Sequence, residues 1–178
     1  LLNDHMNTSM TDVTEESESI RPILEHVYNL VGCNKVYYNY LLDWLAYPIQ
    51  TGRKTNVAVI AQGQQGCGKS LFFKEFIGEM IYGKELFSKI AGGAQIGDFN
   101  AHITGKMYLV IEEPNKFRSD KLHLLNDMIT SPTTEVKAKH KDQYFTNACT
   151  NYVFTCNKIP NNMLADYLDD RSSFHIQH

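Results

Sequence analysis

The chain has 178 residues, of which 43% are apolar and 21% are charged, and its formal net charge is −3. This length and composition predict one globular domain with a full hydrophobic core and exclude a disordered chain. The slightly acidic balance excludes a generally basic surface, so any contact with nucleic acid must come from a local patch.

The sequence also predicts an intracellular protein without a membrane span. Its longest apolar runs, at residues 57–61 and 107–111, are far shorter than the roughly twenty residues of a membrane-spanning helix. The N-terminus lacks the features of a secretory signal, and the scattered cysteines without a CxxC pair indicate reduced thiols rather than disulfides or a zinc site. Because the chain starts with Leu1 and stops at His178 in a strand-like segment, we expect a fragment of a longer polypeptide.

Two helices are expected near the N-terminus. Residues 14–18 offer a cap and first-turn carboxylates for the first helix, whose apolar residues recur at helical spacing over 23–31 until Gly32. A second helix is predicted over 35–47, with Pro48 forcing its end. Its aromatic stripe is assigned to core packing, with the following members: Val36, Tyr37, Tyr40, Leu41, Trp44 and Leu45.

After residue 51 the pattern changes to alternating strands and helices. The apolar run at 57–61 is typical of a strand buried on both faces of a parallel sheet. A Gly-rich turn follows, and then a helix over 71–81 that is closed by Gly83. Later elements are a strand at 107–111, a helix at 120–129 and a strand at 151–156. The predicted fold class is α/β, with a central parallel sheet flanked by helices.

The Gly-rich turn, GQQGCGKS, matches the phosphate-binding pattern G-x-x-x-x-G-K-[ST] between a strand and a helix, as the mechanism requires. Its backbone N–H groups would surround phosphate oxygens, and the following helix would add its positive dipole end. We expect Lys69 to reach the β- and γ-phosphates of ATP and Ser70 to ligate Mg²⁺. Cys67 is interpreted as a tolerated small residue rather than a nucleophile. The predicted nucleotide-binding residues are Gly63, Gln64, Gln65, Gly66, Cys67, Gly68, Lys69 and Ser70.

Two carboxylates, Glu112 and Glu113, follow the strand at 107–111 in the arrangement known as Walker B. Ligands of a parallel α/β sheet bind outside the carboxyl ends of its strands, so both should emerge beside the phosphate-binding turn. One carboxylate would hold Mg²⁺ and the other would polarise the attacking water, with Glu112 as the candidate metal ligand. Which residue performs which task stays open, and an ordinary solvated strand end is the alternative.

Two further features lie between and after these motifs. Asn157 ends the strand at 151–156 and would either orient the attacking water, the role called sensor 1, or form a turn. Residues 131–145 carry the densest basic charge, and the lysines among them alternate with other residues as in one strand of a hairpin. The lysines would contact DNA phosphates without reading sequence, or would only blunt an edge strand. The candidate DNA-binding residues are Lys137, Lys139, His140 and Lys141.

Taken together, GQQGCGKS, LVIEEP, KAKHK and FTCNKIP resemble motifs A, B, B′ and C of superfamily 3 helicases, over about residues 23–176. With LLDWLAYPIQ, they are closer to the poxvirus D5-like and phage primase-helicase group. The resemblance implies an AAA+-like P-loop NTPase, with a helical collar at 1–50 and a C-terminally truncated ATPase core at 51–178. It also implies Arg171 as the arginine that reaches a neighbouring subunit's nucleotide, although a salt bridge with an adjacent aspartate is the alternative. Lys139 and His140 match the pair that relatives carry on the DNA-binding hairpin.

The sequence therefore predicts an ATP- and Mg²⁺-dependent DNA helicase of a viral, phage or mobile-element replication protein. It would act as a homo-oligomer, expected to be a hexamer, on single-stranded DNA at the intracellular site of replication. The expected catalytic residues are Lys69, Glu112, Glu113, Asn157 and Arg171. The alternatives are a P-loop ATPase that packages or loads DNA without unwinding it, and a nucleotide-dependent assembly module. A fused or associated primase, the source element and the polarity of translocation stay open.

Overall fold

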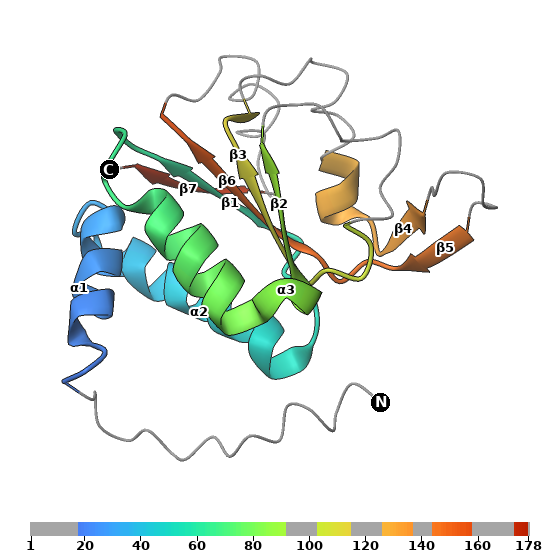
Figure 1. Ribbon diagram of the computed structural model, residues 1–178, viewed down its shortest axis with the longest axis horizontal. Helices are drawn as coiled ribbons and strands as arrows, with labels where there is room; N and C mark the ends of the chain where they lie inside the picture. Colours follow the sequence, from blue (N-terminus) through green and yellow to red (C-terminus); the bar gives the residue numbers. More distant parts are fainter. Residues whose placement is uncertain (1–17, 92–102, 115–125, 137–143, 158–172, 178) are drawn as a thin grey trace.

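The computed structural model describes residues 18–91, 103–114, 126–136, 144–157 and 173–177 (Figure 1). The helical elements are α1 (Arg21–Leu30), α2 (Lys35–Thr51), the π-helix η1 (Leu71–Tyr82) and α3 (Gly83–Leu86). The strands are β1 (Ala58–Gln62), β2 (Phe87–Ala91), β3 (Tyr108–Glu112), β4 (Thr133–Val136), β5 (Tyr144–Asn147), β6 (Asn151–Cys156) and β7 (Ser173–Gln177). A short helix also covers residues 126–130. None of the described helices is long and apolar enough to span a membrane.

Five strands form one sheet in the order β2-β3-β6-β1-β7, and every neighbouring pair is parallel. Because successive side chains of a strand point to opposite faces, a strand covered on both sides is apolar throughout. This is the case for β1, where Val59 and Ala61 join one core cluster and Ala58 and Ile60 join the other. The predicted α/β class, with a parallel sheet flanked by helices, is confirmed.

The two core clusters correspond to the two faces of the sheet. The larger one is built from α1, α2 and η1, which lie together on one side in Figure 1. The smaller one receives Ile103 and, from the short helix at 126–130, Ile129. The N-terminal helices therefore belong to the same packed body as the sheet, and they lie directly beneath the turn that follows β1.

Helix α1 begins later than the acidic segment at 14–18 predicts. It starts at Arg21, after Ile20, with no side-chain cap and no acidic residue in its first turn. Pro22 explains this start, because a proline in the first turn removes only an N–H that has no helical partner and already has a helical φ. The expected first-turn carboxylates are therefore wrong, whereas the predicted stop is observed beside Gly32, which has a φ of +64°.

Helix α2 continues through Pro48 to Thr51, so the predicted end at that proline is wrong. The helix is started by Asn34, whose side chain accepts hydrogen bonds from two backbone N–H groups. Pro48 is buried, and its packing offsets the single backbone hydrogen bond that a proline removes. The helix instead closes at Gly52, which has a φ of +67° and donates its N–H to the Pro48 carbonyl.

The aromatic stripe of α2 is only partly a core feature. Trp44 is buried, and its indole N–H donates to the Val57 carbonyl at 2.8 Å. Tyr37, Tyr40 and Val36 are instead exposed, so their assignment to the core is wrong. The helix contacts the body along one narrow side, and these three residues lie on its other sides.

The helix after the turn, η1, is wound as a π-helix rather than as the α-helix expected from its spacing. Its turns close over five residues, as shown by the hydrogen bond from the Gly83 N–H to the Gly78 carbonyl. Its buried residues accordingly recur at intervals of five, at Phe72, Ile77 and Tyr82 and again at Phe73 and Gly78. Leu71, Met80 and Ile81, which α-helical spacing places on the apolar face, are exposed.

Strands β4 and β5 form a separate antiparallel pair, with Val136 opposite Tyr144. In Figure 1 this arm extends from the side of the body opposite to α1. An antiparallel pair therefore flanks the basic segment, as a hairpin requires. The basic segment itself, residues 137–143 with all four candidate DNA-binding residues, lies outside the described residues, so the strand expected there stays a prediction.

Candidate functional site

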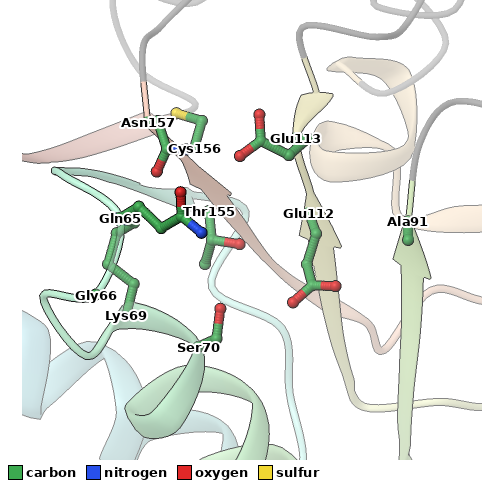
Figure 2. Close-up of a pocket in the computed structure, with 10 residues that line it drawn as sticks. All are labelled: Gln65, Gly66, Lys69, Ser70, Ala91, Glu112, Glu113, Thr155, Cys156 and Asn157. Carbon is green, nitrogen blue, oxygen red and sulfur yellow. The ribbon is translucent and has the colours of Figure 1, made fainter.

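The carboxyl ends of the parallel strands meet at a cavity of about 520 Å³ (Figure 2). Its walls come from the turn after β1, the end of β2, the end of β3 and the end of β6, as expected for ligand binding in an open parallel sheet. The lining residues are Gln65, Gly66, Lys69, Ser70, Ala91, Glu112, Glu113, Thr155, Cys156 and Asn157. The Gly-rich turn, both carboxylates and Asn157 thus lie in one cavity.

The turn is held in place by backbone hydrogen bonds and by two left-handed glycines. Gly63 donates its N–H to the Cys156 carbonyl at 3.2 Å, which ties the turn to the end of β6. Gly66 and Gly68 have φ values of +88° and +90°, a conformation that side chains disfavour. Open space surrounds Gly66, whereas a Cβ on Gly68 would collide with the ring of His26.

Lys69 crosses the turn from the inside and is only 8% exposed. Its Nζ donates to the carbonyls of Gly63 at 2.6 Å and Gln64 at 2.9 Å, and it lies 3.4 Å from the Cys67 sulfur. These partners carry no negative charge, so none of them offsets the charge of the ammonium. Such a buried cation attracts an anion, and an anion would also give it the stronger, charge-assisted hydrogen bond.

The two carboxylates point to different parts of the cavity, as Figure 2 shows. Glu112 is the last residue of β3, and its carboxylate points to the side of the cavity where Ser70 lies. Glu113 adopts a left-handed φ of +51° and donates its N–H to the Thr155 carbonyl at 2.9 Å. This turn directs the Glu113 carboxylate toward the end of β6, where Cys156 and then Asn157 lie. A left-handed non-glycine residue costs on the order of 1–2 kcal/mol, a cost typical of functional sites.

Some residues of the site were not predicted from the sequence. Lys74 of η1 places its Nζ 3.9 Å from a Glu112 oxygen and 3.2 Å from Glu75. No motif marks Lys74, because its approach to Glu112 depends on how η1 packs against β3. Thr155 and Cys156 also line the cavity, and their position as the last residues of β6, just before Asn157, was a usable signal.

Cys156 is a neutral thiol at the cavity wall. Burial and, to a smaller extent, the negative charge of Glu113 together raise its pKa to about 11, against the opposing effect of Lys69. A thiol in this state is a poor nucleophile and a poor metal ligand at neutral pH. The cavity therefore offers carboxylates, hydroxyls and an ammonium as its reactive groups.

The described residues contain no group of three or more His, Cys, Asp or Glu that would hold a metal ion by themselves. Ser70 and Glu112 nevertheless supply two oxygen ligands to the same cavity. Magnesium commonly takes one or two protein oxygens and completes its shell with substrate phosphates and water. The residues present fit a magnesium ion that arrives with a phosphate ligand. Arg171, the expected trans-acting arginine, lies outside the described residues.

A family model matches residues 61–171, from the end of β1 past the acidic pair and Asn157. The chain belongs to the family of unknown function DUF5906. No curated protein matches it.

Solved structures of another protein share the fold. The apo structure of the NrS-1 C-terminal region (305–718) is 22% identical, with a TM-score of 0.70, over 88% of this chain and 38% of that one. The A form apo structure of the same region gives a TM-score of 0.69 and 22% identity, over 88% and 36% of the two chains. At this identity the likeness concerns the fold alone, and the chain spans well under half of the NrS-1 region.

Proposed function

We propose that the chain is an ATP- and Mg²⁺-dependent DNA helicase core with an AAA+-like P-loop fold, from a viral, phage or mobile-element replication protein. The observation that carries the proposal is the convergence of Lys69, Glu112, Glu113 and Asn157 on one cavity beside the Gly-rich turn. These groups meet the needs of phosphoryl transfer, namely a phosphate cradle, metal ligands and a residue that positions water. The fold shared with the NrS-1 region supports the architecture on which this chemistry depends.

In this proposal the triphosphate lies along the turn, where backbone N–H groups and Lys69 bind it. Lys69 then exchanges the carbonyls of Gly63 and Gln64 for β- and γ-phosphate oxygens. Ser70 and Glu112 hold Mg²⁺, which when bound neutralises charge on the phosphates. Lys74, whose Nζ lies 3.9 Å from a Glu112 oxygen, would then pair with Glu75 alone.

The directions of the two carboxylates favour one division of labour over the other. Glu112 faces the Ser70 side of the cavity, which suits a metal ligand. Glu113 faces the end of β6, where Asn157 lies, so it would polarise the attacking water and accept its proton while the amide orients that water. This assignment selects one of the two divisions of labour between the carboxylates that the sequence motif by itself leaves open.

The β4–β5 arm supports single-stranded DNA as the partner. Tyr144 and Phe145 are exposed, the latter at 72%, and they directly follow the basic segment 137–143 in sequence. Exposed aromatic rings next to lysines are typical of proteins that stack bases and bind the phosphate backbone without sequence preference. In a hexameric ring, which we also propose, Arg171 would complete the site of the neighbouring subunit.

The proposal is tested by ATP hydrolysis with and without single-stranded DNA, measured alongside particle mass by light scattering with and without ATP. We expect stimulation by DNA, an ATP-dependent ring and strand displacement on a forked duplex. Stimulation without displacement would instead support an ATPase that loads or packages DNA. ATP-stabilised oligomers with no phosphate release, unchanged in Glu113→Gln, would support an assembly module.

The role of the arm is tested with Lys139→Ala, using Lys35→Ala on α2 as the control for loss of one surface charge. We expect Lys139→Ala to retain basal ATP hydrolysis and to lose most of its stimulation by DNA, because the role proposed for Lys139 is contact with DNA rather than with the nucleotide. The control should keep both activities. Equal loss of basal and stimulated hydrolysis in Lys139→Ala would contradict the separation between arm and cavity.

A further inference from the structure

Helix α1 contacts the phosphate-binding turn through the side chain of His26. We propose that His26 is a positioning residue that orients the Gly68–Lys69 peptide so that its N–H faces the phosphates, an inference that rests on the proposed nucleotide site. The contact joins the helical segment to the turn across 42 positions of sequence. No motif in the sequence marks His26, because its partner is a backbone carbonyl.

The carbonyl oxygen of Gly68 lies within hydrogen-bond distance of two groups, one on α1 and one on η1. His26 Nε2 lies 3.4 Å from this oxygen, and the Phe72 N–H donates to it at 3.0 Å. Because a carbonyl oxygen only accepts, the contact is a hydrogen bond in the tautomer or cation that carries a proton on Nε2. The direction of the Gly68 carbonyl is therefore set by α1 and η1 together.

The direction of this carbonyl also sets the direction of an N–H group. The described peptide bonds are trans, and in a planar trans peptide the carbonyl and the next N–H point in opposite directions. The Gly68 carbonyl points toward His26, which does not line the cavity, whereas Lys69 does. The Lys69 N–H is consequently turned toward the cavity, where it would bind a phosphate oxygen.

The ring of His26 is held tightly in this position. A Cβ on Gly68 would lie 2.3 Å from the His26 Cε1 and 2.5 Å from Nε2, so the ring occupies the space that the glycine leaves open. The ring also packs edge-on against Phe72, with centroids 6.4 Å apart. Next to it, Val27 anchors α1 in the core. Movement of the turn would therefore require movement of this helix.

A polar role and a packing role for His26 are separated by two substitutions. His26→Phe keeps a ring of similar shape but has no donor, whereas His26→Gln keeps an N–H donor at nearly the same reach. We expect His26→Phe to weaken binding of a fluorescent ATP analogue with Mg²⁺ about 3- to 10-fold, the effect of one hydrogen bond. His26→Gln should bind within about twofold of the unchanged protein, and the KM for ATP should rise in His26→Phe with kcat little changed.

The control is Glu25→Gln, an exposed neighbour on the same helix, and thermal unfolding checks that each variant is folded. Unchanged affinity in His26→Phe, or equal loss in the Phe and Gln variants, would overturn the positioning role. If the unchanged protein fails to bind the analogue, the proposed function fails instead, before any variant is compared. The two failures are therefore distinguishable.

Discussion

Both ends of the parallel sheet carry polar side chains, but at the amino end the polar side chain is buried and paired, whereas at the carboxyl end the carboxylates are half-buried. At the amino end, Asn151 is 1% exposed. Its oxygen accepts from the N–H and the hydroxyl of Thr55, and its amide nitrogen donates to the carbonyls of Met107 and Cys149. At the carboxyl end, Glu112 and Glu113 instead turn toward an open cavity.

Left-handed residues occur at both ends, with Gly66, Gly68 and Glu113 at the carboxyl end and Asn56 and Gly105 at the amino end. The two ends therefore differ in how their polar side chains are partnered rather than in backbone conformation. Buried polar groups that satisfy each other stabilise a fold, and polar groups held in strained positions around a cavity are typical of a binding site. The comparison separates structural from functional polar residues without reference to any motif.

The largest expected difference between the ends is that between two lysines that both donate to backbone carbonyls. Lys69 donates to the turn, and Lys54 donates to the carbonyls of Met128 and Ser131. We expect Lys69→Ala to lower ATP hydrolysis by about 10²- to 10³-fold or more, because it removes a preorganised charge at the phosphates. Lys54→Ala should retain hydrolysis and lose stability. Steady-state ATPase and thermal unfolding on both variants measure this, and equal loss of hydrolysis would break the comparison.

A smaller effect is expected for two asparagines, namely Asn151, the first residue of β6, and Asn157, the residue that follows β6. Asn151→Ala leaves buried backbone groups without partners and should lower the free energy of unfolding by about 1–3 kcal/mol. Asn157→Ala, at the exposed end of the same strand, should leave unfolding nearly unchanged and lower kcat. Urea unfolding and ATPase assays on both variants test this. A stable Asn151→Ala protein would show that the amino-end network contributes little.

The smallest effect is expected between η1 and the sheet, where Tyr82 of η1 and Tyr108 of β3 stack with centroids 4.9 Å apart. Their buried hydroxyls have no hydrogen-bond partner among the described residues. Tyr108→Phe removes such a hydroxyl and should change stability by less than about 1 kcal/mol, toward greater stability. Urea unfolding at neutral pH measures the change. A clear loss of stability would mean that the Tyr108 hydroxyl has a partner after all.

The same pair predicts a pH dependence. Burial raises the pKa of Tyr82 to about 12 and raises that of Tyr108 well above its usual value. The unfolded tyrosines ionise near about pH 10, so the folded protein holds more protons above that pH, and its stability falls as pH rises from about 10 toward 12. Replacing both residues with Phe should flatten this decline. Part of it should persist, because burial also raises the pKa of Tyr152 to about 12.

Several features of the site were predictable because they depend on neighbouring residues alone. The turn at 63–70, the buried strands β1, β3 and β6, and the carboxylates after β3 follow from glycine positions and unbroken apolar runs. Parallel pairing then requires the strand ends to share one edge. The meeting of Lys69, Glu113 and Asn157 at one cavity was therefore foreseeable.

The wrong predictions of helix bounds and burial have a common cause. In each case two local structures were compatible with the sequence, and a contact with a distant segment selects one of them. Pro48 stays within α2 because its ring is buried. Met80 is exposed because η1 winds as a π-helix whose other residues fill the core. The spacing of a short segment does not contain the partner that selects between such alternatives.

By itself, the sequence determined the parallel α/β architecture, the buried strands β1, β3 and β6 and the position of the Gly-rich turn. The tertiary structure alone decided that Glu112 and Glu113 face different parts of the cavity, that Lys74 approaches Glu112 and that His26 contacts Gly68. Strands and glycine turns are specified by residues within a few positions of one another. The direction of a side chain at a site depends on backbone turns and packing between segments tens of residues apart, which no local pattern records.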